Sequence, residues 1–581
     1  MCAKQVFSIF FLTLLVMLSI SFSHIVSNNF AFEGNNPKFS VKLLWFRGLG
    51  YSADGKNWPI LIDTDYDSDL EIIACGGMDN IVAFSHDGKI LANISGMKRL
   101  SQNPFPFVAD YDNDGRLEYF FASDHRIIII DTYLWRVDDI ISFPKDTFIT
   151  GMIYGNWDED EDKELLVDCP LKGLYIYDFK DAKSYLIING SIVSGRQIWV
   201  WGPIRPMDGK RIVFFNFPLL YCALGVVDVF DKRVLWAVNI SEYGMLTGFD
   251  FYVGDFDGDG VKEIVVPGYY PELYIFSGDD GSLEAYFNFT DYVRRGPCTD
   301  YFAVCDLNGD GIMEGVFALT PYFGYWSNKS VGILAVINMR SYTIEKLITY
   351  SKEEFGYYGI SPQSLNILDA NLDGVYDILV MNFGNITIYD GRTLTPMFTF
   401  NVSVFFKDQE LSGFGWAWGT DYVELVVRDI DDDGRVEMVN LCGALSISVY
   451  RLMVEPFLAP LIYWNPPYGY LNAFGCFENF DRDHDRVADW VEAQFGFSNN
   501  SVDSDGDGVS DFDEILSIYR NMSYGNASPE YLWVFISLVF IPPIAITAVL
   551  VYCVRRRKNV GMRPRCESAS YSPCLDMLGC M

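Results

Sequence analysis

Seven short loops of this chain share one spacing of carboxylate and amide side chains. Each begins with Asp or Asn and has an oxygen-bearing side chain at positions one, three, five and nine; the loops begin at residues 63, 110, 156, 255, 306, 369 and 429. Calcium is a hard cation that takes six to eight oxygen ligands, which a tight turn with alternating acids can supply. Glycine at position six, present in five of the seven loops, permits the sharp bend. The repeated spacing therefore predicts seven calcium sites.

The predicted ligands of these loops are the side chains at the four shared positions. They are Asp63, Asp65, Asp67 and Glu71; Asp110, Asp112, Asp114 and Glu118; Asn156, Asp158, Asp160 and Glu164; Asp255, Asp257, Asp259 and Glu263; Asp306, Asn308, Asp310 and Glu314; Asp369, Asn371, Asp373 and Asp377; and Asp429, Asp431, Asp433 and Glu437. We expect the loop at Asp255 to bind best, because it combines three Asp with Gly and Glu. The loop at Asn156 should bind less well, because Glu161 replaces the turn glycine.

The intervals between the loops predict the architecture that positions them. They are 47, 46, 99, 51, 63 and 60 residues, and the interval of 99 has room for a hidden unit. The segment Trp201–Phe217 fits that unit, since it keeps Asp208-Gly209 but lacks the acids at positions one, three and nine; it predicts strands without a metal. Each unit has an apolar strand before its loop and three strands after it. Four strands in a period of about 50 residues predict an all-β propeller over residues 57–465, with eight blades and seven as the alternative.

A second pair of acidic loops follows the propeller. Residues 481–492 and 503–514 each have acids at positions one, three, five, nine and twelve. The second loop has Gly508 at position six, whereas the first has Arg486 there and should be the weaker site. The two loops begin 22 residues apart, which is too close for two complete helix-loop-helix hands. The predicted ligands are Asp481, Asp483, Asp485, Asp489 and Glu492, and Asp503, Asp505, Asp507, Asp511 and Glu514.

Two stretches resemble known calcium-binding families. The unit VGDFDGDGVKEIVVPG, residues 253–268, resembles the FG-GAP or VCBS-type repeat of integrin α-subunit propellers and of microbial surface proteins. The chain departs from that family because the Phe-Gly and Gly-Ala-Pro signatures are mostly absent, and because integrin propellers have seven blades. The stretch DWVEAQFGFSNNSVDSDGDGVSDFDEI, residues 489–515, resembles thrombospondin type 3 repeats, which implies a stiff calcium-binding stalk over residues 479–516 with little hydrophobic core. A dockerin-like pair and a disordered acidic linker are the alternatives.

The two ends of the chain predict a membrane protein. Lys4 and the apolar run at 6–22 indicate a signal peptide over residues 1–27, with an uncleaved anchor as the alternative, followed by a lead-in at 28–56. After a linker at 517–530, residues 531–554 are 24 residues without a charge, enough to cross a bilayer. Arg555–Lys558 follow directly, which places the tail 555–581 in the cytoplasm. We therefore expect a single-pass type I protein of the cell membrane with its ectodomain outside.

Composition excludes several classes of function. The net charge of −34 makes nucleic acid an unfavourable partner. The chain has four histidines and neither a glycine-rich phosphate loop nor a G-x-S-x-G motif, so no catalytic residue and no cofactor other than Ca²⁺ is predicted. Ten Asn-x-Ser/Thr sequons fall in the predicted ectodomain and make it a candidate glycoprotein. Cys298 and Cys305 could form a disulfide across a short loop, or could be two buried apolar residues.

The sequence thus favours a calcium-binding surface protein that recognises an extracellular protein or glycan and is not an enzyme. A membrane-anchored polysaccharide lyase or glycoside hydrolase is one alternative, and a structural surface-coat protein is another. By resemblance to integrin-like propellers, recognition would use the face opposite the calcium loops. The inserts Pro321–Ser330 and Phe405–Tyr422 mix aromatic, polar and glycine residues and are the candidate recognition loops. The alternative is that their tryptophans, including Trp416 and Trp418, fill the core between blades.

Overall fold

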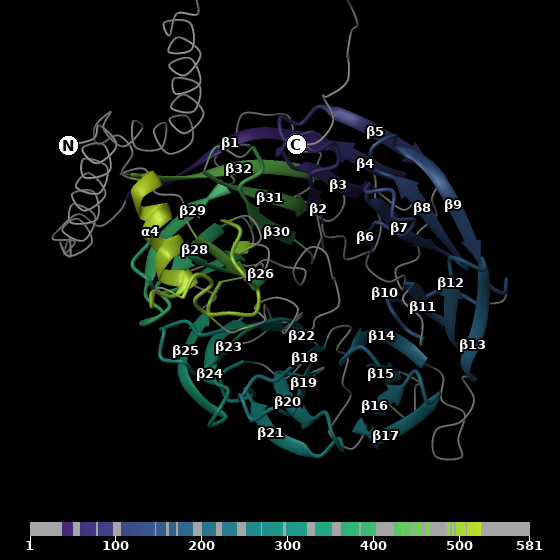
Figure 1. The fold of residues 1–581 in the computed structure, drawn as a ribbon. Helices are drawn as coiled ribbons and strands as arrows, with labels where there is room; N and C mark the ends of the chain where they lie inside the picture. The colour runs from purple at the N-terminus through teal and green to yellow at the C-terminus, as the bar shows by residue number, and fades with distance from the viewer. Residues whose placement is uncertain are drawn as a thin grey trace, which may run out of the picture. The chain divides into compact units, whose positions relative to one another are not determined.

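The strands of this chain form the blades of a propeller, and the description rests on a computed structural model. It describes residues 38–49, 59–76, 80–96, 106–145, 147–158, 162–169, 172–189, 200–216, 223–240, 251–268, 270–293, 298–321, 332–350, 362–382, 385–402, 423–431, 433, 435–442, 446–455, 461–464, 483, 485–487, 491–492, 495–506 and 508–523. Among these residues the strands form eight antiparallel sheets, which Figure 1 shows arranged around a ring. The prediction of eight blades is confirmed.

The first four blades take their strands in chain order, so each blade is one continuous stretch of chain. Blade one contains β2 (Ile60–Ile62), β3 (Glu71–Gly76), β4 (Asn80–Phe84) and β5 (Ile90–Ser95); blade two β6 (Phe107–Ala109), β7 (Glu118–Ser123), β8 (Arg126–Asp131) and β9 (Arg136–Ser142); blade three β10 (Gly151–Gly155), β11 (Glu164–Cys169), β12 (Gly173–Asp178) and β13 (Lys183–Asn189); and blade four β14 (Val200–Pro206), β15 (Arg211–Asn216), β16 (Ala223–Asp228) and β17 (Arg233–Asn239). Blade four contains the hidden unit at 201–217, so that prediction is also confirmed.

Blades five to seven follow the same order. Blade five contains β18 (Tyr252–Gly254), β19 (Glu263–Pro267), β20 (Glu272–Ser277) and β21 (Leu283–Asn288); blade six β22 (Cys298–Cys305), β23 (Glu314–Pro321), β24 (Gly332–Asn338) and β25 (Thr343–Tyr350); and blade seven β26 (Pro362–Asp369), β27 (Asp377–Asn382), β28 (Asn385–Tyr389) and β29 (Pro396–Asn401). A fifth strand, β33 (Leu461–Trp464), pairs antiparallel with β26 at the inner edge of blade seven. The chain therefore returns to blade seven after it has completed blade eight.

Blade eight joins the two ends of the propeller. Its first three strands are β30 (Val423–Arg428), β31 (Val436–Cys442) and β32 (Ser446–Glu455), and its fourth is β1 (Lys38–Gly48) from the N-terminal side. β1 runs antiparallel to β32, with Lys38 opposite Glu455 and Gly48 opposite Ser446. The sequence places residues 28–56 before the propeller as a lead-in, but β1 lies in that range and closes the ring by hydrogen bonding to β32.

The core lies between the faces of neighbouring blades. All six residues of β7 are buried, because a blade stacked between two others is covered on both faces. The outer strand β9 shows the opposite pattern, with a single buried residue among seven. Large rings such as Tyr119, Phe276 and Phe317 fill the space between blades. This agrees with the high aromatic content, since flat side chains fill wide inter-blade layers.

The structure excludes a bridge between Cys298 and Cys305, which is one of the two interpretations of this pair. The two residues begin and end the single extended strand β22. Seven steps of about 3.3 Å separate their Cα atoms by roughly 23 Å, whereas a disulfide needs about 7 Å or less. Cys305 is buried, as the alternative interpretation has it.

The predicted membrane segments lie outside the described residues. These are the signal segment 1–27, the span 531–554 and the tail 555–581. Within the part of the chain that the structure describes, no helix has the length and apolar character needed to cross a membrane.

Candidate metal loops and the docked acidic module

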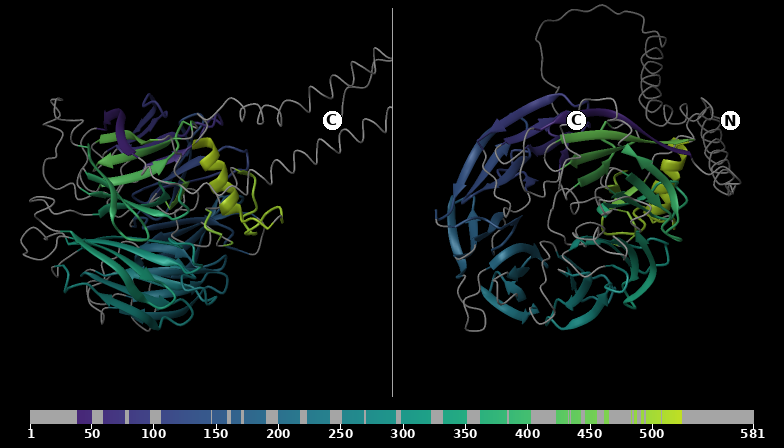
Figure 2. Two further views of the ribbon diagram at one scale, coloured as in Figure 1. Left: turned by 90° about the vertical axis from the view of Figure 1, so that its left-hand side faces the viewer. Right: turned by 180° about the vertical axis from the view of Figure 1, so that it is seen from behind.

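Every acidic loop of the propeller connects the first strand of a blade to the second. The loop that begins at Asp255, for example, leaves β18 and ends where β19 begins at Glu263. Because strands alternate in direction and each loop joins the same strand pair, all the loops open on one face of the ring (Figure 2). We call this face the loop face.

The carboxylate at position nine closes each loop in the same way. One of its oxygens accepts a hydrogen bond from the backbone N–H of position two. The donor and acceptor pairs are Thr64 and Glu71 (2.8 Å), Tyr111 and Glu118 (3.3 Å), Trp157 and Glu164 (2.7 Å), Phe256 and Glu263 (2.7 Å), Leu307 and Glu314 (2.9 Å), Ala370 and Asp377 (3.1 Å), and Ile430 and Glu437 (3.1 Å). The second oxygen of Glu263 has no hydrogen-bond partner among the described residues, whereas those of Glu314 and Glu437 accept from Asn308 and Arg451.

Positions one and six set the bend. In the loop at Asp255, the two carboxylate oxygens of that residue accept the N–H groups of Gly258 at 2.9 Å and Gly260 at 3.0 Å. Gly260 has a φ of +88°, in the left-handed region that glycine enters without steric cost. The first loop has Ser68 at the same position with a φ of +79°. A non-glycine residue there costs about 1 kcal/mol, which explains why glycine is common at position six.

Four propeller loops bring three or more carboxylates together. Ligand oxygens lie within 4.8 Å of one another in the groups Asp63, Asp65 and Glu71; Asp110, Asp112 and Glu118; Asp255, Asp257, Asp259 and Glu263; and Asp429, Asp431 and Glu437. The Asp255 group holds all four predicted ligands of its loop. Asp160 lies outside the described residues, so the predicted set of the Asn156 loop is only partly described.

Burial perturbs the position-nine acids. Together with a smaller contribution from neighbouring loop aspartates, it raises the pKa of Glu118 to about 8 and that of Glu263 to about 9, although the backbone N–H bond to each acid opposes the shift. Burial likewise raises the pKa of Glu314 and of Glu437 to about 8. Glu263 is 1 % exposed, and its Oε1 has no hydrogen-bond partner among the described residues. A cation inside the loop would offset the cost of the buried negative charge and would also bind the oxygen that lacks a hydrogen-bond partner.

Blade four shows how a loop closes without these acids. Arg211 begins β15, where the neighbouring blades three and five begin their second strand with Glu164 and Glu263. Its Nε donates to Asp208 Oδ2 at 2.7 Å. Although burial alone would raise the pKa of Asp208, hydrogen bonds from Lys210 and Arg211 hold it below its usual value. The loop thus contains its own cation, the Arg211 side chain.

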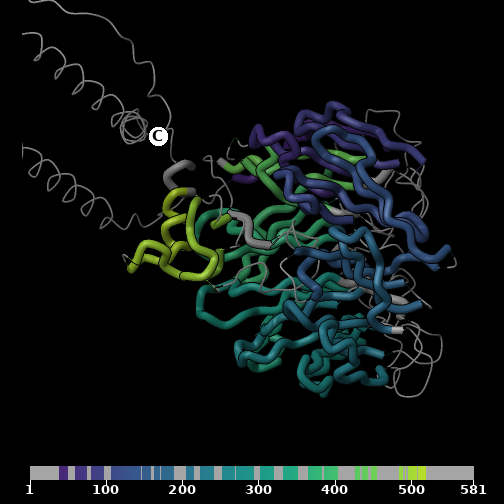
Figure 3. The backbone as a smooth tube through the Cα atoms, turned by 45° about the vertical axis from the view of Figure 1, so that its right-hand side comes forward, coloured from purple at the N-terminus to yellow at the C-terminus, as the bar shows by residue number. Residues whose placement is uncertain are grey.

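The second pair of acidic loops lies against the propeller and not apart from it. Figure 3 shows residues 483–523 beside the green and teal blades. The helix α4 (Asp511–Ser523) follows the second loop, and its Phe512, Ile515 and Leu516 belong to the same buried cluster as Leu307 and Tyr376 of blades six and seven. The sequence predicts a separate stalk with little hydrophobic core, whereas these residues pack into the buried cluster of the propeller. We call the described residues of 483–523 the docked module.

Arg486 provides the polar part of this docking. Its Nε donates to the backbone oxygen of Asp306 at 3.1 Å and its Nη2 to that of Gly374 at 3.0 Å, which are positions one and six of two neighbouring loops. Tyr376 in turn donates its hydroxyl hydrogen to the Arg486 carbonyl. The guanidinium also lies 4.2 Å from the centre of the Phe512 ring. The residue that weakens the predicted first site is therefore the one that binds two propeller loops.

The loops of the docked module repeat the propeller geometry. In the second, Asp511 at position nine accepts the N–H of Ser504 at 2.8 Å, and Asp503 accepts that of Gly508 at 2.9 Å. In the first, ligand oxygens of Asp483, Asp485 and Glu492 lie within 4.8 Å of one another. Burial raises the pKa of Asp485 to about 7. Asp481, Asp489 and Asp507 lie outside the described residues.

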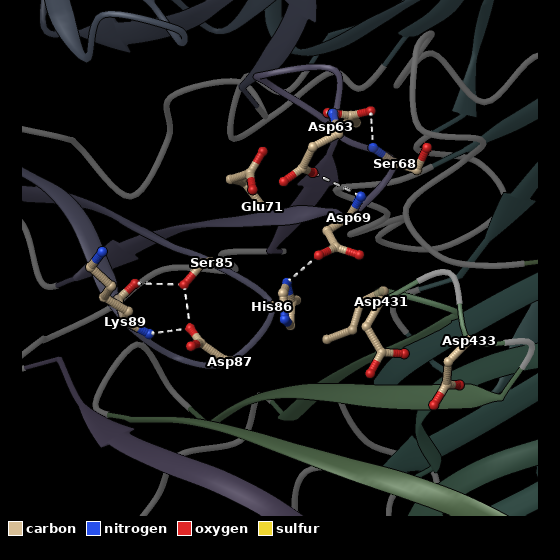
Figure 4. Close-up of polar contacts among 12 residues, drawn as sticks. Asp63, Ser68, Asp69, Glu71, Ser85, His86, Asp87, Lys89, Asp431 and Asp433 are labelled. Atoms are coloured by element: carbon tan, nitrogen blue, oxygen red, sulfur yellow. Dashed lines mark hydrogen bonds and ion pairs between the residues drawn. The ribbon is translucent and has the colours of Figure 1, made fainter.

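A histidine–aspartate pair lies on the loop face between blades one and eight. His86 Nδ1 is 2.9 Å from Asp69 Oδ2, and about a third of the histidine side chain is exposed. Figure 4 shows Asp431 and Asp433 of the last loop near this pair. His86 belongs to the turn between β4 and β5, and its ring is paired with the carboxylate of Asp69.

No known protein family and no curated protein sequence matches the chain. Solved structures of similar fold include a europium-containing methanol dehydrogenase (TM-score 0.46, 9 % identity, 71 % of this chain and 93 % of that one), the Vibrio cholerae biofilm matrix protein Bap1 (0.38, 14 %, 76 % and 96 %) and BamB from Moraxella catarrhalis (0.38, 9 %, 71 % and 97 %). Likenesses this distant concern the fold alone and carry no inference about activity. The strand order and the loops define the class, an eight-bladed β-propeller with acidic loops on one face.

Proposed function

We propose that the acidic loops bind calcium and that the propeller they stabilise is a recognition domain at the cell surface. The observation that supports calcium most directly is Glu263, a carboxylate that is 1 % exposed and whose Oε1 has no partner among the described residues. An unsatisfied buried carboxylate oxygen costs on the order of 1–3 kcal/mol or more. Such a group is retained where a ligand satisfies it.

Calcium fits the chemistry of this loop. Asp255, Asp257, Asp259 and Glu263 offer only oxygen, the donor that calcium prefers over the nitrogen and sulfur that zinc takes. Four acids within 4.8 Å repel one another, and a divalent ion would cancel much of that repulsion. The role is structural, because the loops join strands at the edge of each blade and binding to the folded state alone adds stability.

The test of calcium binding is thermal unfolding with and without the ion. We expect the melting temperature to rise with calcium, and Asp257→Asn to reduce that rise. The matched control is Asp208→Asn in blade four, whose loop already holds Arg211 and should leave the calcium response unchanged. An unchanged melting temperature after exhaustive chelation would refute calcium binding.

Recognition is assigned to the face opposite the loops. The first strand of each blade runs toward the loop face, and the following strands alternate in direction. The second strand β23 and the fourth strand β29 therefore end at the opposite face, where β24 and β30 begin. Of the two candidate inserts, only Pro321 lies within the described residues. The docked module contacts the loop face, so the opposite face of blades six and seven is not covered by it. An extracellular protein or glycan is the proposed ligand, with residues 531–554 as the membrane anchor.

The test of recognition is an array of glycans and proteins probed with residues 28–528 in calcium and in chelator. Binding that is lost in Trp416→Ala and Trp418→Ala without a change in melting temperature would support a site on that insert. A lowered melting temperature would show that the tryptophans belong to the core. If the protein depolymerised an acidic polysaccharide on the array, the result would favour a polysaccharide lyase or glycoside hydrolase over a recognition domain.

A further inference from the structure

The loop of blade eight already contains a cation, which is a side chain of this protein. Arg451 on β32 lies opposite Glu437 in the strand register. Its Nη2 donates to Asp431 Oδ2 at 2.6 Å, its Nη1 to Asp433 Oδ2 at 2.9 Å, and its Nε to Glu437 Oε1. Each nitrogen of the guanidinium thus binds one of the carboxylates at positions three, five and nine.

This arrangement is buried at its centre. The Glu437 side chain has no exposed surface, and that of Arg451 is 12 % exposed. A guanidinium presents its donors in a rigid plane, so three bonds to three separate acids fix its position inside the loop. Charge-assisted bonds of this kind are about twice as strong as neutral ones. The contact is therefore part of the folded blade and not a mobile surface ion pair.

The residue on the third strand that lies opposite the position-nine acid distinguishes blade eight from four other blades. In blades two, three, five and six, the registers place Asp131, Asp178, Ser277 and Asn338 at that point. None of these side chains is positively charged. The four blades therefore present acidic loops without a cation from the third strand, whereas blade eight supplies one.

Calcium and this guanidinium compete for the same oxygens. Calcium takes six to eight oxygen ligands at 2.3–2.6 Å, and Asp431, Asp433 and Glu437 each direct one carboxylate oxygen to Arg451, which brings a positive charge into the loop. We propose that Arg451 is the resident cation of the Asp429 loop, which consequently binds no calcium and stays closed when calcium is removed. The inference rests on the proposed calcium binding of the other loops. It reassigns Asp431, Asp433 and Glu437 from metal ligands to partners of Arg451, and it removes the predicted metal role of Asp429.

The position of this loop in the ring gives the arrangement a consequence. Blade eight holds the N-terminal strand β1, and Ile430 of its loop accepts the N–H of Leu70 of blade one at 2.8 Å. Trp45 of β1 also donates to the carbonyl of His86 in blade one at 2.7 Å. The junction that closes the ring is thus built on a loop whose cation does not dissociate. Loss of calcium should loosen the other loops before it opens this junction.

The experiment counts the calcium bound per full-length chain by equilibrium dialysis and elemental analysis at saturating calcium. Arg451→Ser gives blade eight the residue that blade five has opposite its acid, and we expect it to bind one more calcium ion than the native protein. In chelator its melting temperature should fall below the native value, and calcium should restore it. The matched control is Arg435→Ser, which removes the same charge from the same loop. The Nη1 of Arg435 lies 3.5 Å from Asp433 Oδ2, but Arg435 is not the residue opposite Glu437 in the strand register.

The reciprocal variant covers the case in which Arg451→Ser does not fold. Ser277→Arg places an arginine opposite Glu263, and we expect it to bind one calcium ion fewer than the native protein. A native protein that binds calcium, together with an unchanged count in both variants, would overturn the role of Arg451 and leave the proposed calcium function intact. A native protein that binds no calcium would overturn both.

Discussion

Arg486→Gly should separate metal binding by the docked module from its attachment to the propeller. Arg486 has a φ of +80° and stands at position six, where the second loop has Gly508 with a φ of +94°. Glycine should relieve the strain of the left-handed backbone and leave the acids of the first loop in place. The same change removes the side chain that contacts the loops of blades six and seven.

The size of the effect follows from these contacts. Two charged hydrogen bonds to backbone oxygens contribute about 1.5–3 kcal/mol each, and a guanidinium 4.2 Å from the Phe512 ring contributes about 1 kcal/mol more. Relief of the backbone strain returns about 1 kcal/mol. The lower end of these contributions sums to about 3 kcal/mol, so we expect docking to weaken by roughly a hundredfold or more. Ile515 and Leu516 keep their buried contacts, so docking should weaken and not disappear.

Hydrogen exchange of the full-length protein in calcium measures this directly. Amides of α4 and of the loops at Asp306 and Asp369 should exchange up to a hundredfold faster in Arg486→Gly, while blades one to four remain unchanged. Arg116→Gly, on the loop of blade two, removes the same charge from the same face and should leave α4 protected. Equal protection of α4 in Arg486→Gly and in the native protein would refute the docking role of Arg486.

Three further predictions concern the rest of the molecule. Without calcium, the free energy of unfolding should fall as pH rises from about 5 to about 9. The pKa values of Glu118 (about 8) and Glu263 (about 9) are raised in the folded state, so ionisation of these acids over this range destabilises the fold. Denaturant unfolding that shows rising stability over this range would contradict the prediction, and calcium should flatten the dependence on pH. Cys169 is buried and burial raises the pKa of its thiol, so a thiol reagent should label it only after unfolding, and rapid labelling of the native protein would contradict the structure. Gly88→Ala should lower stability by about 2 kcal/mol or more, since its Cβ would lie 2.5 Å from the Trp45 ring at a φ of +80°; Gly96→Ala, with a φ of +85° and nothing within 4 Å, should show the backbone cost alone, and equal melting temperatures for the two variants would exclude the clash.

The features that sequence could predict are the ones that repeat. The period of the loops predicts eight blades, and even the unit without its acids at 201–217 is recognisable from the length of the gap. The closure by β1 is not predictable in this way, because Lys38 and Glu455 pair across most of the chain and the alternation of a strand does not identify its partner. The docking of residues 483–523 is not predictable for a related reason. In the sequence, Arg486 only replaces the glycine of a calcium loop, and its contacts with Asp306 and Gly374 become known from the structure alone.

Arginine and metal are alternative answers to the same electrostatic problem on the loop face. Seven blades place a buried acid at or next to the start of the second strand, and a buried acid needs a cation nearby. Blade four avoids the problem by placing Arg211 at that point, next to Asp208. Blade eight keeps the acid and supplies Arg451 from the third strand. One residue per blade, either at the start of the second strand or opposite it, therefore decides whether a loop depends on an ion from solution, and this choice sets which blades should respond when calcium is withdrawn.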